Sequence, residues 1–165
     1  MSDSLQRANK EIAEIYERHR MTVYRVCYAY MKNRMDTEDA VQETFFRLIR
    51  NNPVLKSAEH EKAWLIRTAS NVCKDELKRR RRTEESLDDH PELQMPDMQP
   101  HADVLRAVTE LPDKYKTVIY LYYYEGYDSA EIAAMLRLPK STVRNRLHDA
   151  RKLLKERLGA DFDEE

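Results

Sequence analysis

The chain has 165 residues, of which 41% are hydrophobic and 36% charged, and its net charge is −1. This composition is typical of a soluble, helix-rich protein. It contains two glycines, too few for a P-loop or a Gly-rich dinucleotide turn, where several glycines let the backbone approach phosphate.

The small net charge conceals an uneven distribution. Residues 62–82 carry eight Lys/Arg and two acidic residues, and 137–157 again carry eight Lys/Arg and two acidic residues. Between them, residues 83–103 carry seven acidic residues and no Lys/Arg. Two basic segments separated by an acidic one indicate two cationic surfaces.

The sequence offers little for an enzyme or a metal site. Cys27 and Cys73 lack Cys-x-x-Cys spacing and are expected to be small buried apolar residues, and the five histidines are scattered. The polar N-terminus lacks the apolar core of a signal peptide, and no apolar run is long enough to span a bilayer. We therefore expect a cytoplasmic protein that is not an enzyme and has no cofactor or metal.

Apolar residues at helical spacing predict three helices in the first half. The first helix turns one side inward: Ile12, Ile15, Tyr16, His19, Val23, Cys27 and Tyr30. Asp36 is expected to cap the second helix, which packs through Val41, Phe45 and Leu48 and ends before Pro53. After a loop over 51–61, a third helix is expected from Lys62 to about Arg81, with an inward face of Leu65, Ala69, Val72 and Cys73.

An acidic linker is expected at residues 83–101. This stretch has three prolines and few apolar residues, so it cannot bury enough surface to offset the entropy of ordering. It would divide the chain into two helical units, 10–82 and 102–158. The predicted fold class is all-α.

The second unit is expected to end in a helix-turn-helix. A short helix through Val104, Leu105, Val108 and Leu111 precedes a helix that begins after Pro112 and ends at Gly126. Asp128 and Glu131 then form a capping-box pattern, and a turn over 137–140 leads to a last helix for which Ser141 is the expected cap. The alternative is an antiparallel helical hairpin with a solvated basic side.

The last helix has two distinct faces. Its apolar seam, expected to pack on Ile132 and Leu136, consists of Val143, Leu147, Ala150 and Leu154. The positions expected to face outward near its start are Ser141, Arg144, Asn145 and His148. Side chains suited to phosphate lie on the flanks: Lys140, Arg146, Arg151 and Lys152. Such a face fits a major groove.

Two more surfaces are candidates. On the third helix, cations and an asparagine spaced four, three, four and three form a stripe suited to nucleic acid: Arg67, Asn71, Lys74, Lys78 and Arg81. His60 and Trp64 near its start suit stacking on an unpaired base, although Trp64 equally fits a core position. On the second helix, Phe46 lies among polar residues on the outer face, as a protein-interface anchor or as an isolated exposed side chain.

Three segments together resemble regions 2 and 4 of the extracytoplasmic-function sigma factors of the sigma-70 family. They are "DAVQETFFRL" (39–48), "WLIRTASNVCKDELKRR" (64–80) and residues 110–151, which include "STVRNRLHDAR". The resemblance implies a transcription initiation factor that binds core RNA polymerase at the β′ clamp helices and β flap, recognises promoter DNA and helps to melt it. It also implies a cognate anti-sigma factor and a stress or envelope-response regulon.

The resemblance carries roles onto individual positions. For polymerase binding these are Asp39, Gln42, Glu43 and Phe45, joined by the neighbouring Phe46. For the minus-10 element they are the loop over 51–61 and, on the helix after it, Trp64, Asn71 and Asp75. The stacking and stripe candidates His60, Arg67, Lys74 and Lys78 are expected to join the same minus-10 surface. For the minus-35 element they are Lys140, Ser141, Thr142, Arg144, Asn145, Arg146, His148, Arg151 and Lys152. Asp149 departs from the family's usual residue there.

Two other functions remain open on the residues alone. A helix-turn-helix repressor or activator would share the second unit but would leave the outer face of the second helix without a purpose. An RNA-binding or antitermination adaptor would use the Arg-rich run at 78–82 on RNA. Promoter-specific transcription that depends on core polymerase would distinguish a sigma factor from the first alternative. Tighter binding to duplex DNA than to RNA would distinguish it from the second.

Overall fold

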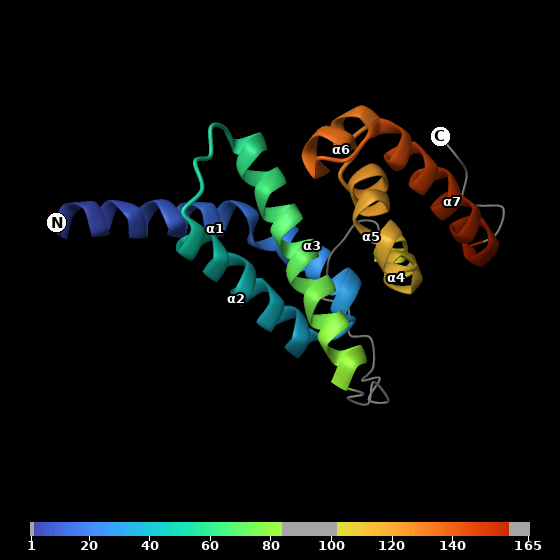
Figure 1. The fold of residues 1–165 in the computed structure, drawn as a ribbon, viewed down its shortest axis with the longest axis horizontal. Helices are drawn as coiled ribbons and strands as arrows, with labels where there is room; N and C mark the ends of the chain where they lie inside the picture. Colours follow the sequence, from blue (N-terminus) through green and yellow to red (C-terminus); the bar gives the residue numbers. More distant parts are fainter. Residues whose placement is uncertain (1, 84–101, 159–165) are drawn as a thin grey trace.

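The computed structural model describes residues 2–83 and 102–158, and every regular element within these ranges is a helix (Figure 1). This confirms the predicted all-α fold class. None of the described helices is long and apolar enough to cross a membrane. The proposed linker falls almost wholly outside the described residues.

The first unit is a bundle of three helices. α1 (Ser2–Met31), α2 (Arg34–Asn51) and α3 (Ala58–Thr83) each pack against the other two. Their apolar seams pack together in a core that includes fully buried Val23, Leu65 and Ala69. Burying such side chains stabilises the fold by roughly 1.5–3 kcal/mol for each valine or leucine.

Two predicted helix starts in this unit are wrong. The N-cap of α2 is Asn33, whose side chain accepts a hydrogen bond from the backbone N–H of Asp36, so Asp36 lies inside the helix. α3 begins at Ala58, not Lys62, because the Ser57 hydroxyl accepts from the backbone N–H of His60. The loop over 51–61 is therefore shorter than expected.

The second unit contains four α-helices and one π-helical turn. They are α4 (Ala102–Glu110), α5 (Asp113–Ile119), η1 (Tyr120–Tyr124), α6 (Ser129–Leu136) and α7 (Lys140–Leu158). The capping box at α6 is confirmed: Asp128 accepts from the Glu131 N–H, and Glu131 accepts from the Asp128 N–H. Gly126 has φ +82°, which explains a glycine there.

The structure corrects three details in this unit. The helix after Pro112 does not stay α-helical to Gly126 but widens into η1. The turn before the last helix is one residue shorter than expected, because α7 begins at Lys140. Ser141 consequently lies in the first turn of α7 and not in front of it.

The two units pack against each other (Figure 1). α1 contacts α4 and α5, and α3 contacts α6, so segments far apart in the sequence lie side by side. The prediction of two helical units joined by a linker included no contact between them.

Candidate nucleic-acid and polymerase interfaces

The last helix, α7, turns its apolar seam inward and its base-reading candidates outward. Val143, Leu147, Ala150 and Leu154 are all buried, as is Ile132 of α6, against which the seam was expected to pack. The outward set Ser141, Arg144, Asn145 and His148 is exposed. α7 therefore presents an exposed polar face of the kind that the helix-turn-helix hypothesis requires for binding a major groove.

The flanking candidates on α7 divide into two groups. Lys140 and Lys152 are exposed. Thr142 and Arg146 are half-buried, and the half-buried Arg151 places its guanidinium 4.7 Å from the ring centroid of Tyr122. That contact holds Arg151 against its own unit. Asp149 is exposed beside the outward face.

The expected stripe on α3 is not one free surface. Asn71 and Lys78 are exposed, but Arg67 and Lys74 are half-buried against the second unit. Burial lowers the pKa of both side chains, and Arg137 adds to this for Arg67, as Arg146 does for Lys74. The helical phase was right, but the second unit covers part of the stripe.

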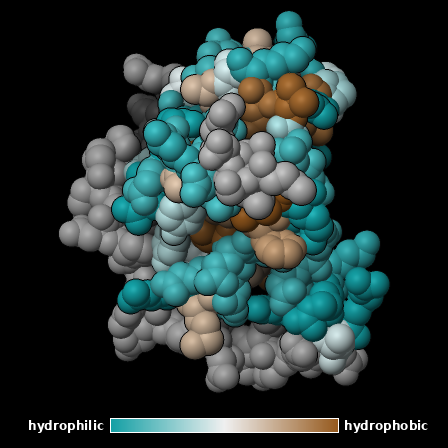
Figure 2. Space-filling view, turned by 90° about the vertical axis from the view of Figure 1, so that its left-hand side faces the viewer, coloured by the Kyte–Doolittle hydropathy of each residue, from teal (hydrophilic) through white to brown (hydrophobic). Residues whose placement is uncertain are grey.

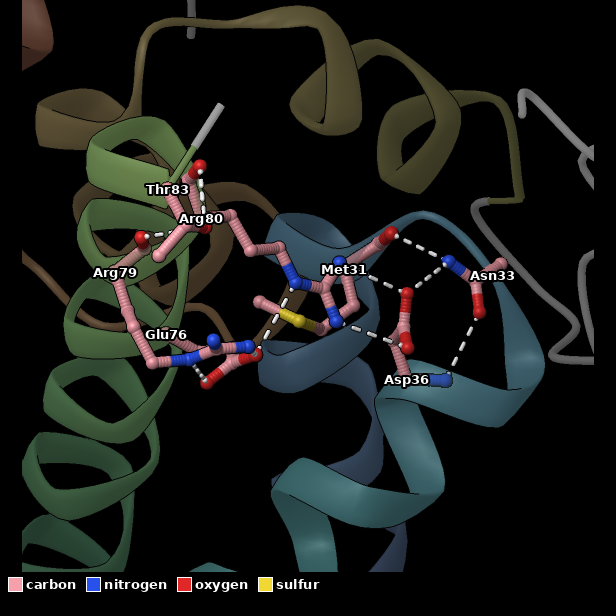
Figure 3. Close-up of polar contacts among 7 residues, drawn as sticks. All are labelled: Met31, Asn33, Asp36, Glu76, Arg79, Arg80 and Thr83. Atoms are coloured by element: carbon pink, nitrogen blue, oxygen red, sulfur yellow. Dashed lines mark hydrogen bonds and ion pairs between the residues drawn. The ribbon is translucent and has the colours of Figure 1, made fainter. Parts of the chain in front are cut away.

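The Arg-rich end of α3 is anchored to the start of α2 (Figure 3). Arg80 donates through Nη1 to Asp36 at 3.0 Å and through Nε to Glu76 at 3.1 Å, and Arg79 also binds Glu76. The hydrogen bond from Arg80 lowers the pKa of the Asp36 carboxyl. This part of the run therefore holds the bundle together, while Lys78 and Arg82 remain exposed.

The loop between α2 and α3 is held at both ends. Asn52 takes a left-handed conformation, φ 43°, and its N–H donates to the Leu48 carbonyl. At the other end His60 accepts from the Lys56 N–H through Nδ1. Val54 between them is 80% exposed. His60 and Trp64 are both half-buried beside this loop, which agrees with either expectation for Trp64.

The sequence reading missed Glu61, a buried carboxylate beneath this loop. It accepts a hydrogen bond from Arg18 at 3.1 Å and lies 2.7 Å from Nε2 of His19, so it ties the start of α3 to α1. It thereby positions His60 and Trp64. Helical spacing predicts that His19 faces the core, and a buried histidine needs a polar partner. This was the one sign in the sequence that a buried carboxylate such as Glu61 should lie near it.

The outer side of α2 borders an open groove of about 760 Å³ between α1 and α2. Apolar side chains line much of it: Tyr16, Met21, Tyr24, Phe45, Phe46 and Ile49. Phe46 is 55% exposed, whereas Phe45 is buried against Tyr16 with ring centroids 4.9 Å apart. Figure 2, seen from the side of the N-terminus, shows apolar surface emerging at two places on a mostly hydrophilic face.

Of the polar candidates on α2, Gln42 lines this groove, whereas Asp39 and Glu43 lie outside its lining. Asp39 and Gln42 are exposed, and Glu43 is half-buried and accepts from Arg47 at 2.9 Å. The groove thus combines an exposed apolar anchor, Phe46, with polar lining from Gln42, Glu38, Arg20 and Arg34, which suits a protein partner with a mixed polar and apolar surface.

Both cysteines are free and buried, as expected. The hydrogen bond with Cys73, together with burial, raises the pKa of the Cys27 thiol, which keeps it protonated and unreactive. Among the described residues no group of three His, Cys, Asp or Glu side chains could hold a metal ion.

Two family matches cover most of the chain. Residues 15–83 match Sigma-70 region 2, and residues 101–154 match Sigma-70 region 4. The ECF RNA polymerase sigma factor SigL of Mycobacterium tuberculosis is 31% identical over 151 residues, which are 86% of this chain and 85% of SigL.

Other relatives are similarly distant. SigW of Bacillus subtilis, also an ECF sigma factor, is 27% identical and the match covers 88% of each chain. SigE of Mycolicibacterium smegmatis is 32% identical over 92% of this chain but only 63% of its own length. The solved sigma factor RpoE of Bartonella quintana, in complex with the anti-sigma factor NepR, shares the fold with a TM-score of 0.66 at 20% identity, over 94% of this chain and 99% of RpoE.

Proposed function

Because the chain belongs to the extracytoplasmic-function sigma factors of RNA polymerase, we propose a division of labour in which each of its surfaces serves one step of transcription initiation. As a member of this family it is a transcription initiation factor, which binds core polymerase and directs it to promoters. Residues 10–82 would act as region 2, 83–101 as the linker and 102–158 as region 4.

The minus-35 element is assigned to the exposed face of α7. The observation that carries this is the full burial of the opposite seam, which leaves Arg144, Asn145 and His148 exposed with no apolar surface between them. Arginine pairs with guanine and asparagine with adenine in the major groove, whereas Lys140 and Lys152 suit phosphates. Ser141, Thr142, Arg146 and Arg151 complete the proposed set, Arg151 with its freedom reduced by Tyr122.

The minus-10 element is assigned to the loop over 52–57 and to α3. With the two units in contact, as in this structure, Asn71 and Lys78 are exposed and can bind DNA directly. His60 and Trp64 flank the loop, where a base extruded from the duplex could stack. Arg67 and Lys74 belong to the same surface but become available only after the two units separate.

Polymerase binding is assigned to the α1–α2 groove. Phe46 is the apolar anchor, and Asp39, Gln42 and Glu43 supply the polar rim. Phe45 supports the groove from within, since its side chain is buried. We assign the chain no catalytic residue, cofactor or metal, and place it in the cytoplasm with the polymerase.

A cognate anti-sigma factor and a stress or envelope-response regulon are part of the proposal. The similarity to RpoE, whose structure was solved with an anti-sigma factor, supports the first. The family of the relatives supports the second.

The test is transcription from a promoter library by core polymerase, with and without the chain. We expect new transcripts that start at a common motif and depend on the chain. Phe46→Ala should weaken holoenzyme formation by about 2 kcal/mol or more, roughly 30-fold, if Phe46 is an interface hot spot. Met35→Ala, a control at a side chain 74% exposed on the same helix, should have little effect. Absence of chain-dependent transcripts would contradict the proposal.

A further inference from the structure

A buried lysine joins the two units. Lys116 of α5 is 2% exposed, and its Nζ donates to the Ala29 carbonyl at 2.7 Å. α1 ends at Met31, so this carbonyl belongs to the last turn, whose carbonyl groups have no partner within the helix. The second unit thus supplies a cation to the negative end of a helix in the first.

An arginine of the first unit does the same in the opposite direction. Arg67 of α3 donates through Nη1 to the Met135 carbonyl at 2.6 Å. α6 ends at Leu136, so this carbonyl also lies in a last turn. Each unit therefore caps the C-terminus of a helix in the other, an arrangement that we call the reciprocal caps.

Side-chain contacts surround the reciprocal caps. The Thr117 hydroxyl of α5 lies 2.8 Å from the Tyr30 hydroxyl of α1 and 2.8 Å from the Ser70 hydroxyl of α3. Lys62 of α3 donates to Glu125 at 2.9 Å, just after η1. All these groups could bond water instead, so the interface can open without leaving polar atoms unsatisfied.

The same interface brings cations of the two DNA surfaces together. Lys74 of α3 interacts unfavourably with Arg146 of α7, and Arg67 with Arg137 at the end of α6. Like charges at close range oppose closure. DNA bound to the closed form could only neutralise the repulsion between these cations. In the open form DNA could contact the cations of both units in full, which is the larger gain.

We propose that the free chain is self-inhibited: the reciprocal caps hold the two units closed, and Arg67 and Lys74 reach DNA only when the units separate. Arg67 cannot donate to Met135 and to a phosphate with the same N–H. A ligand shifts such an equilibrium by its preference for one form, so single-stranded DNA should favour the open form. The inhibitory half of this inference rests on the proposed function of α3.

The experiment uses the full chain with dyes for energy transfer on Glu14→Cys and Lys155→Cys, two exposed positions in the two units; the native cysteines are buried. Lys116→Glu sets a carboxylate against the α1 carbonyls and should open the chain. Lys114→Glu, the same charge change at an exposed site two residues away, is the control. We expect high transfer in the parent chain and in Lys114→Glu, and a clear loss in Lys116→Glu.

The second measurement is the affinity for a single-stranded DNA 20-mer of random sequence at low salt. Lys116→Glu should bind it several-fold more tightly than Lys114→Glu does. If Lys116→Glu fails to fold by circular dichroism, Tyr30→Phe, which loses only the hydroxyl at Thr117, replaces it, with Tyr24→Phe as its control.

Low transfer in the parent chain would overturn the closed state, and high transfer retained in Lys116→Glu would overturn the role of the reciprocal caps in holding it. Lost transfer with unchanged DNA affinity would overturn the inhibition. Asn71→Ala and Lys78→Ala in the opened chain test the proposed function separately, since both residues are exposed in either form. No effect of these two substitutions on DNA affinity would overturn the role of α3 in DNA binding, while the transfer result would still support closure.

Discussion

Two exposed residues of α7, Asn145 and Lys152, lie two helical turns apart and are expected to act differently on DNA. Asn145→Ala should relax the preference at one base pair of the minus-35 element, by about 1–3 kcal/mol, because an amide can pair bidentately with adenine. Lys152→Ala should weaken binding to all sequences alike, because a phosphate contact carries no base information.

Selection of bound duplexes from a randomised minus-35 library measures both effects of these substitutions. The Lys152→Ala variant is the control for a general loss of charge or stability. An unchanged base preference at every position in Asn145→Ala would show that this side chain does not face the bases.

At this scale the sequence predicted α7 well and α3 only in part. The seam of α7 packs within its own unit, so apolar spacing alone identifies the outward Asn145. The stripe of α3 has the predicted phase, but Arg67 bonds a carbonyl 68 positions away. Helical periodicity says which residues share a face and nothing of what covers that face.

Among the helices, α2 carries the proposed polymerase anchor and begins at a side-chain cap, Asn33. Asn33 accepts from the Asp36 N–H at 2.9 Å and donates to the Met31 carbonyl at 3.1 Å, so one side chain serves the ends of two helices. Asn33→Ala should lower the free energy of unfolding by about 1 kcal/mol, within the 0.5–2 kcal/mol range for such caps.

Urea unfolding followed by circular dichroism measures this loss of stability. Asn51→Ala, at the exposed last residue of the same helix, is the matched control and should change stability little. Equal losses in the two variants would show that the α2 cap contributes nothing particular.

Element types followed from the sequence more reliably than element ends. Asn33 and Asp36 are both good capping residues, and only the structure shows which one has the extended backbone. At α6 the Asp128–Glu131 pair left less choice, and the capping box is confirmed. The π-helical turn at Tyr120–Tyr124 had no local signal, because stacked tyrosines fit an α-helix equally well.

For the molecule as a whole, closure of the two units should depend on pH. Burial lowers the pKa of Lys116 to about 8 from 10.5, with Lys32 acting in the same direction and Asp113 and Cys73 opposing it. In the open form the amine is hydrated and keeps its ordinary value, so the open form binds more protons between these two pH values. Closure should therefore strengthen as pH rises from about 8 to 10.5, because the neutral amine still donates to the Ala29 carbonyl and no longer carries a charge that is costly to bury.

The total change in the open–closed equilibrium should be up to roughly 300-fold, which is the ratio set by these two pKa values. Energy transfer between the two labelled units, recorded across this range, measures it. Burial raises the pKa of Tyr30, and for Lys62 desolvation is outweighed by the bonds to Tyr127 and Glu125, which raise its pKa, so neither adds to the effect. Burial also lowers the pKa of Lys74, which therefore acts in the same direction as Lys116. Lys116→Arg keeps a donor that remains protonated, so most of the pH dependence of closure should be lost in this variant; an undiminished pH dependence would assign it to another group.

The contact between the units was beyond the reach of the sequence. Lys116 stands in an apolar helix, in "YKTVIYL", and a lysine there was a sign of a buried partner. Its acceptor is a backbone carbonyl, which every residue has, so no residue type could have identified Ala29. The two-unit architecture and the family were evident from the sequence, whereas the closed arrangement needed coordinates.

The reciprocal caps also limit how freely the two halves of such factors can be exchanged. A chimera that joins this first unit to the second unit of a relative would keep both DNA-reading surfaces. It would close only if the new partner brings a cation to the end of α1 and offers Arg67 a free carbonyl. Hybrid factors built without these two features should therefore stay open. Their transcription activity should no longer depend on the step that separates the two units in the parent chain.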